Sequence, residues 1–442
     1  MSDNLPEETY QGPTAWHNEA MRKRVAKRYR KERFFKAFGI AGLSLASLAL
    51  AVLIGSILYM GLSGFSTTSI KLDITLDPAV IGDLSNRTDL ERTSMLQQAN
   101  YNTLIRDSLR VKFPEAKKRK EVFALMRLIS NGARDEIRQK LVDKPGLVGE
   151  TISIDLPASS NVDMFVKGQI KRDVPQSDRK ISDQQIAWID QLDAEGRVSR
   201  GFNWRFLSTG DSREPELAGV WGAVVGSFYT LMVCFLVAFP VGVASAIYLE
   251  EFAPQNRWTD LIEVNINNLA AVPSIVFGLL GLAIFLNVFN MPRSAPMVGG
   301  LTLALMTLPT IIIAARAAIK AVPPSIRDAA IGLGASPVQT VFHHVLPLSM
   351  PGILTGTIIG MAQALGETAP LLMIGMVAFI VDIPQGITDA ATALPVQVFL
   401  WADSPERGFL EKTSAAIIVL LGFLVIMNGL AIWLRQKFET RW

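Results

Sequence analysis

The sequence predicts an all-α polytopic membrane protein with six membrane-spanning helices and an α+β insert after the first of them. Half of its 442 residues are hydrophobic and only 19% are charged. Residues 71–216 hold 24 Lys/Arg and 23 Asp/Glu, whereas residues 217–442 hold only 22 charged side chains. A soluble globular protein has no physical reason to segregate its charge in this way, but a membrane protein with one large aqueous segment does.

The six predicted spans are long stretches that are almost free of charge. A bilayer core of about 30 Å needs about 20 apolar residues of helix. The stretches are 37–70, 216–250, 263–293, 293–316, 351–381 and 413–434. They divide the chain into a basic tail (1–36), a first transmembrane helix (37–65), the insert (66–216) and a five-helix core (217–442).

The orientation follows from the Lys and Arg residues near the span ends. Nine basic residues lie between Arg22 and Lys36, and Arg435, Lys437 and Arg441 follow the last span. Positive charge flanks the cytoplasmic ends of spans, so both termini are expected in the cytoplasm. An even number of spans then places the insert outside the cytoplasm and the loop 320–351 inside. The first span is longer than a signal-peptide core, so we interpret it as a retained anchor.

The insert is predicted to be a folded α+β domain. The segments SIKLDITLD and TISIDLP alternate as strands do, and apolar residues from Val122 to Leu141 recur at helical spacing. Asp183 is a candidate helix cap. The insert contains no histidine, metal-ligand spacing or nucleophile constellation. Contact with a partner or a structural cover is therefore expected in place of chemistry, and a dock, a lid and a spacer remain open.

The loop 320–351 is predicted to form a helix–glycine–helix elbow. Pro323 and Pro324 favour the start of a helix, and Gly332 and Gly334 favour its end. Ser336-Pro337 is expected to open a second helix, and Pro347 and Pro351 to close the loop. The residues alone leave two interpretations open, a docking surface and an ordinary connector.

Three pieces of this loop resemble the EAA loop of ABC importer permeases. Asp328-Ala329-Ala330 is followed by Gly334 four residues later, and Leu346-Pro347 comes after the gap typical of that loop. Asp328 replaces the usual Glu, and His344 stands where Ile is common. The resemblance implies the type I ABC importer fold and an ATPase docked on this loop. It assigns ATPase coupling to seven residues: Arg327, Asp328, Ala329, Ala330, Gly334, Leu346 and Pro347.

Two further motifs are similar to the phosphate-specific subfamily of these permeases, the A-type subunit in its long-insert form. They are AVPSIVFGL at 271–279 and GETAPLL at 366–372, supported by Leu308-Pro309. The resemblance covers residues 217–435. It implies a bacterial inner-membrane protein whose partners are a sibling permease, an ABC ATPase dimer, a periplasmic phosphate-binding protein and phosphate itself.

Glu367 is the only formally charged residue well inside a predicted span. A charge at that depth costs about 2.5–3.5 kcal/mol, so it usually marks a pathway. The resemblance assigns Glu367, Thr368 and Gln363 to the substrate path or gate. Family members often carry Arg where this chain has Gln363. The nearest candidate cation in this chain is therefore Arg316, for which snorkelling to the interface is the simpler interpretation.

Close packing is the interpretation for the glycines of the fifth span, Gly352, Gly356, Gly360 and Gly366.

No catalytic machinery, cofactor or metal is expected. The sequence has no GxxxxGK[ST] loop and no HExxH motif, and its histidines are His17, His343 and His344. The net charge of +3 gives no argument for nucleic acid. The leading hypothesis is the transmembrane permease subunit of an ABC importer for inorganic phosphate, with ATP hydrolysed on a separate subunit. The alternatives are a permease for another oxyanion, molybdate or sulfate, and a membrane-anchored sensor or scaffold.

Overall fold

The computed structural model describes residues 19–82 and 89–438, and it divides into two units, residues 1–59 and 60–442. The first unit consists, in its described part, of helix α1 (Glu19–Gly64), whose last residues belong to the second unit. The basic segment from Arg22 to Lys36 and the first predicted span are one continuous helix. His17 and the rest of residues 1–18 lie outside the described residues.

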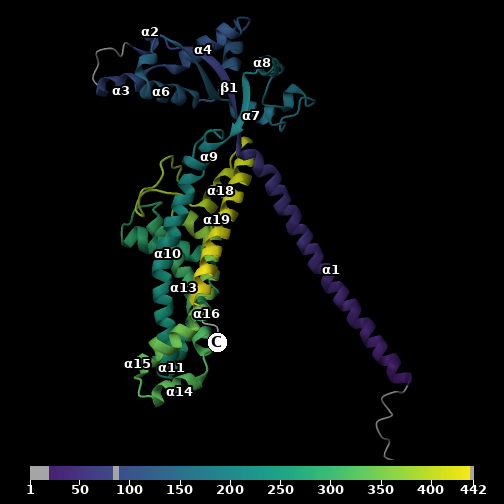
Figure 1. Cartoon of the computed structure of the whole chain (residues 1–442), viewed down its shortest axis with the longest axis vertical. Helices are drawn as coiled ribbons and strands as arrows, with labels where there is room; N and C mark the ends of the chain where they lie inside the picture. Colours follow the sequence, from purple (N-terminus) through teal and green to yellow (C-terminus); the bar gives the residue numbers. More distant parts are fainter. Residues whose placement is uncertain (1–18, 83–88, 439–442) are drawn as a thin grey trace, which may run out of the picture. The chain divides into compact units, whose positions relative to one another are not determined.

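The insert contains a three-stranded antiparallel sheet of order β2-β1-β3. Its central strand β1 is labelled in Figure 1. Its strands are β1 (Ser66–Thr75), β2 (Thr151–Pro157) and β3 (Val198–Phe202). Side chains of β1 alternate between buried and exposed, because successive residues of a strand point to opposite faces. Both strands that the alternation predicts are present, whereas β3 has an irregular burial pattern and was not predicted.

Helices cover this sheet. Together they enclose a hydrophobic cluster of the insert's own, which includes Leu109, Phe113 and Trp188. The predicted helix at 183 is present, but its N-cap is Ser182 and not Asp183, because Ser182 forms a capping box with Gln185. The insert helices are α2 (Pro78–Ile81), α3 (Asp89–Gln98), α4 (Tyr101–Lys112), α5 (Arg119–Met126), α6 (Ala133–Asp143), α7 (Ser160–Val166), α8 (Asp183–Ala194) and α9 (Trp204–Ser208), with short 3-10 turns at Pro145–Leu147 and Gln176–Asp178.

The regular elements of the core are all helices in its described part, and residues 374–393 between α17 and α18 form neither helix nor strand. Its helices are α10 (Trp221–Ile247), α11 (Arg257–Ala270), α12 (Ser274–Gly281), α13 (Pro296–Lys320), α14 (Pro324–Gly332), α15 (Pro337–Thr340), α16 (Leu346–Gly366), α17 (Ala369–Met373), α18 (Leu394–Ala402) and α19 (Gly408–Phe438), with π-helical segments η4 (Tyr248–Phe252), η5 (Leu282–Val288) and η6 (Val341–Val345). Five helices of the described chain are long and apolar enough to cross a membrane, and one bent pair would make a sixth.

The third predicted span is not a straight helix. The helix Arg257–Ala270 meets the segment Ser274–Val288 at an angle of 101°. Pro273 lies at this bend as the N-cap of α12, and because proline has no N–H group it cannot continue the hydrogen bonds of the preceding helix. The expectation of six spans therefore holds only if this bent pair counts as one.

The fifth predicted span begins earlier than expected and is interrupted. Pro347 and Pro351 do not close the loop: Pro347 lies in the first turn of α16 and Pro351 lies inside it. The π-helical segment η6 runs directly into α16, and interior prolines are tolerated in membrane helices because local π-helical adjustments satisfy the freed backbone groups. The helix then stops at Gly366, and only the short α17 follows.

A seam of small residues joins α13 to α16. A Cβ atom added at Gly352 would lie 2.7 Å from Cβ of Ala318, and one added at Gly356 would collide with Ala314. The close-packing prediction is therefore confirmed at these two glycines. It is wrong at Gly366, which has open space around it because the helix ends there.

A buried ionic cluster, called the junction below, connects the insert to α19 and to the end of α1. Lys167 is fully buried, and its Nζ lies 2.6 Å from Asp163 Oδ2 and 2.7 Å from Glu411 Oε1. The same Nζ donates to the carbonyl of Ser66 at 2.8 Å. The other members are Ser63 and Gln169, which donate to Glu411, and Lys412, which donates to the carbonyl of Gly64.

Candidate functional site: a helix break and an elbow

Glu367 lies at a break between two helices. It is the C-cap of α16, with extended backbone, and Thr368 is the N-cap of α17. Glu367 and Thr368 are half-buried, whereas Gln363, one turn earlier, is exposed. Within the described residues no hydrogen bond or ion pair forms at the Glu367 carboxylate. An acidic group at a chain break between apolar helices is suited to a pathway, because the non-helical backbone there must face protein or water.

The two motifs that carried the phosphate-type resemblance are in contact with each other. Gly278 of α12 lies so close to α17 that an added Cβ would be 2.7 Å from the Cα atom of Pro370. Gly281 packs in the same way against Thr302 and Ile374. The structure thus brings the segments 271–279 and 366–372 together, although they are about 90 residues apart.

Arg316 does not pair with Glu367. Its guanidinium pairs with two other carboxylates. Its guanidinium lies 2.6 Å from Glu263 Oε1 and 3.3 Å from Glu250 Oε2. The side chain therefore connects α13 to α11 and to η4. The interpretation of Arg316 as the cation for Glu367 is therefore wrong, because carboxylates from two other segments pair with it.

The predicted elbow is present. Helix α14 ends at Gly332, Gly334 has φ +90°, and Ser336 caps α15 through a capping box with Gln339. Of the residues predicted to couple to an ATPase, Asp328, Ala329, Gly334 and Pro347 are exposed, whereas Ala330 is buried. Large apolar side chains are exposed beside them, led by Leu333 at 91% of its surface and followed by Ile331, Val338 and Phe342.

Arg327 holds the elbow to the core. Its Nη2 lies 2.6 Å from Glu251 Oε1, and its guanidinium also donates to the carbonyls of Val322 and Ile319, at 2.7 and 3.1 Å. A guanidinium has five donors in a fixed fork, so one side chain can serve all three acceptors. The sequence pointed to Arg327 but not to Glu251, since nothing in the spacing connects positions 76 residues apart.

No group of three or more His, Cys, Asp or Glu side chains in the described chain could hold a metal ion. His343 and His344 are both exposed on η6.

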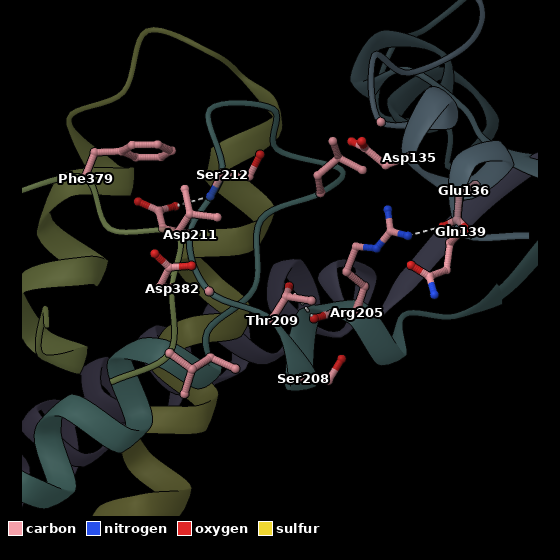
Figure 2. A pocket seen from close by; sticks show the side chains of 15 residues that line it. Asp135, Glu136, Gln139, Arg205, Ser208, Thr209, Asp211, Ser212, Phe379 and Asp382 are labelled. Carbon is pink, nitrogen blue, oxygen red and sulfur yellow. Dashed lines mark hydrogen bonds and ion pairs between the residues drawn. The ribbon is translucent and has the colours of Figure 1, made fainter. Parts of the chain in front are cut away.

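A cleft of about 550 Å³ lies between α6, α9 and the segment 379–383 (Figure 2). Four carboxylates line it, those of Asp135, Glu136, Asp211 and Asp382. Arg205 is the one cation in the lining, and it pairs with Glu136. This balance of charge is unfavourable for an anion, so the cleft is not a phosphate site.

Two carboxyl groups near this cleft are buried. Burial raises the pKa of Asp211 above its ordinary value, although Trp401 donates a hydrogen bond to it at 2.8 Å. Burial also raises the pKa of Glu216 to about 7, and its Oε2 atom has no hydrogen-bond partner. The nearby charges of Glu214 and Asp163 act in the same direction.

The helix breaks were missed, although the sequence carries a signal for each. Gly366 followed four residues later by Pro370 is a helix stop and restart, and Val272-Pro273 marks the bend between α11 and α12. The junction has no comparable signal, because Lys167 and Glu411 are 244 residues apart.

Two family models match this chain. Residues 238–440 match the binding-protein-dependent transport system inner membrane component, and residues 22–176 match a domain of unknown function, DUF3333. The first match covers most of the core, including the helix break and the elbow. The second covers the basic segment, the first span and much of the insert.

The chain is also similar to curated permeases. It is 31% identical to the phosphate transport system permease protein PstA of Mycobacterium leprae (strain TN) over 235 residues, which cover 51% of this chain and 75% of that protein. It is 33% identical over 171 residues to the probable ABC transporter permease protein YqgI of Bacillus subtilis (strain 168), which cover 38% of this chain and 58% of that one. Among solved structures, the MetNI methionine ABC transporter in inward-facing conformations matches 50% of this chain and 98% of its own, with 15% identity and a TM-score of 0.41.

Proposed function

This chain belongs to the family of binding-protein-dependent transport system inner membrane components, and we propose that it forms half of the translocation path for inorganic phosphate in an ABC importer. A membrane-embedded transport subunit of this family carries out no chemistry itself. We further propose that both termini and the elbow are cytoplasmic, that the insert faces the periplasm, and that ATP is hydrolysed on a separate ATPase dimer.

The observation that carries the proposal is Glu367 at the break between α16 and α17. The break exposes a short stretch of non-helical backbone next to an acid that has no partner in the described chain. The tight contact of Gly278 with Pro370 fixes the position of α17. Relatives named as phosphate transport permeases support phosphate as the substrate.

Glu367 and phosphate both carry negative charge when they are ionised. A carboxylate facing phosphate alone would repel it. Two arrangements remove the repulsion: a cation from the sibling permease, or a proton shared between the carboxyl group and phosphate. Arg316 is excluded from this role by its pairs with Glu250 and Glu263. We favour the sibling permease, since it contributes the other half of the path.

The elbow supports ATPase docking. Leu333, Ile331, Val338 and Phe342 form an exposed apolar surface around Gly334. Exposed apolar groups rimmed by polar ones are typical of protein interfaces. The polar pair Arg327–Glu251 would transmit a movement of α14 to the end of α10, because η4 follows α10 without a break.

The test is uptake of labelled phosphate by the chain reconstituted with a sibling permease, an ATPase and a binding protein. We expect ATP-dependent uptake by wild type and loss of at least about 90% of it in Glu367→Gln. Asp260→Asn is the matched control, since Asp260 is an exposed acid of α11, and should transport normally. Equal uptake by wild type and Glu367→Gln would remove Glu367 from the path. Uptake of molybdate or sulfate, together with no uptake of phosphate, would contradict phosphate as the substrate.

A further inference from the structure

Two adjoining cavities of the second unit lie on either side of the loop 169–182. One, of about 190 Å³, lies between α7, this loop and Arg407. The other, of about 320 Å³, lies between α5, the same loop and the start of α8. Arg179 and Lys180 line both. We call this pair the basic cavities.

The lining of the basic cavities is strongly cationic. Six Lys and Arg side chains contribute to it: Lys120, Arg127, Lys171, Arg179, Lys180 and Arg407. Asp178 is the only carboxylate in either lining. Two of these cations form ion pairs with carboxylates that do not line the cavities: Arg179 with Asp183, and Lys180 with Glu406. Residues 71–216 have nearly equal numbers of acidic and basic residues, so this local excess is not a consequence of composition.

Arg179 gives an independent indication that a ligand is missing. Its side chain is only 6% exposed, and its Nε atom is buried without any hydrogen-bond partner. Buried N–H donors are almost always paired, because an unpaired one loses its hydration and gains nothing. Because Arg179 lines both cavities, a turn of its side chain would bring Nε to an acceptor bound in either of them.

The chemistry of these groups selects an oxyanion. Guanidinium groups match the geometry of phosphate oxygens, and lysines add point charges. Asn161 and Gln176 line the cavities with amide groups that can donate to further oxygens. A cavity of 190 Å³ has room for one tetrahedral oxyanion with several waters but not for a folded segment of another protein.

We propose that the basic cavities bind a phosphate group on the insert side of the chain, separately from the path at Glu367. The site rests on its own residues; the proposed function only makes phosphate the first ligand to try. The group has two possible sources. It is free phosphate, or it is the headgroup of a lipid, since Arg407 directly precedes the apolar helix α19.

The experiment measures equilibrium binding of radiolabelled phosphate to the full permease–ATPase complex in phosphatidylcholine nanodiscs. Wild type is compared with the double variant Lys171→Gln/Arg407→Gln, which changes two exposed side chains without an ion-pair partner in the described chain. The matched control is Lys140→Gln/Lys144→Gln, which removes the same charge from exposed positions of α6 and its C-cap. We expect affinity at least about tenfold weaker in the first variant and within about twofold of wild type in the control.

A second arm identifies the source of the phosphate group. The complex is reconstituted with phosphatidylglycerol, extracted, and the retained lipid is counted by mass spectrometry. If Lys171→Gln/Arg407→Gln retains less phosphatidylglycerol but binds free phosphate as wild type does, the bound phosphate group belongs to a lipid. That result would support the site. Arg179→Lys keeps the charge but removes the Nε donor, and should weaken whichever ligand binds.

Two outcomes would overturn the inference. One is unchanged phosphate binding together with unchanged lipid retention in the double variant. The other is weaker capture of the binding protein with both ligands unaffected, which would make the basic surface a protein dock. Phosphate uptake is measured in parallel, so that failure of the transport proposal in wild type is distinguished from failure of this site.

Discussion

The elbow and the junction both attach a peripheral segment to the core through ion pairs, but they do so at different depths. At the elbow, the Arg327 and Glu251 side chains remain 22% and 11% exposed. At the junction, Lys167 is fully buried and Glu411 is 5% exposed. Buried charges are strongly destabilising when one partner is lost, whereas partly solvated ones are not. The elbow can therefore shift at small cost, and the junction cannot.

The variant Lys167→Met tests the difference between the junction and the elbow with the largest expected effect. It leaves Asp163 and Glu411 as buried carboxylates without their shared cation, so we expect a loss of about 3–5 kcal/mol in the free energy of unfolding. Denaturation followed by tryptophan fluorescence in detergent measures it. Lys180→Met is the control, because Lys180 and Glu406 are about half exposed, and it should cost less than about 1 kcal/mol. If both variants lose the same free energy of unfolding, the buried ion pairs of the junction stabilise the protein no more than an exposed ion pair does.

A second test uses pH at the edge of the junction. Burial raises the pKa of Glu216 to about 7, so the folded protein holds a proton that the unfolded chain releases above its ordinary pKa near 4.5. Stability conferred by that proton is present below pH 4.5 and is lost as the pH rises through 7. Wild type should lose about 1–3 kcal/mol more between pH 5 and pH 8 than Glu216→Gln. Parallel pH profiles for the two proteins would contradict the burial of this carboxyl group.

At the elbow the expected effect is smaller. Arg327→Ala removes one partly exposed ion pair and two hydrogen bonds, and should destabilise α14 by about 1–2 kcal/mol. Hydrogen exchange of residues 324–332 measures it, together with ATPase co-purification. Arg327→Lys should be intermediate, since one ammonium cannot reach all three acceptors in the same geometry. An effect of Arg327→Ala as large as that of Lys167→Met would invalidate the comparison.

The smallest expected effect is at Gly334. Its φ of +90° is unfavourable for any residue with a Cβ, so Gly334→Ala should cost about 1 kcal/mol. Gly332→Ala is the matched control: it lies at the last position of α14 with open space around it and should be neutral. The melting temperatures of the two variants measure the difference. Equal values would show that the turn at Gly334 does not need its left-handed backbone.

The same contrast explains what the sequence could predict. The bounds of β2, the helix ending near Gly332 and the opening of α15 at Ser336 depend on residues within a few positions of one another. Local patterns determine such features. The junction and the pair Arg327–Glu251 depend on partners far apart in the chain, and no periodicity encodes them. The break at Glu367 lies between these cases, since Gly366 and Pro370 signalled it but hydropathy alone runs through it.

Between these two charged attachments lies the seam of α13 and α16, where Gly352 and Gly356 meet Ala318 and Ala314. No side-chain hydrogen bond or ion pair crosses it within the described residues. Dispersion forces between small groups are insensitive to ionic strength and to titration. High salt should therefore weaken the partly exposed elbow pair first, and strong acid should weaken the junction by protonating its carboxylates. Neither condition acts on this helix pair, which should be the most persistent part of the core. The amides of α13 and α16 are accordingly expected to be the last to exchange with deuterium.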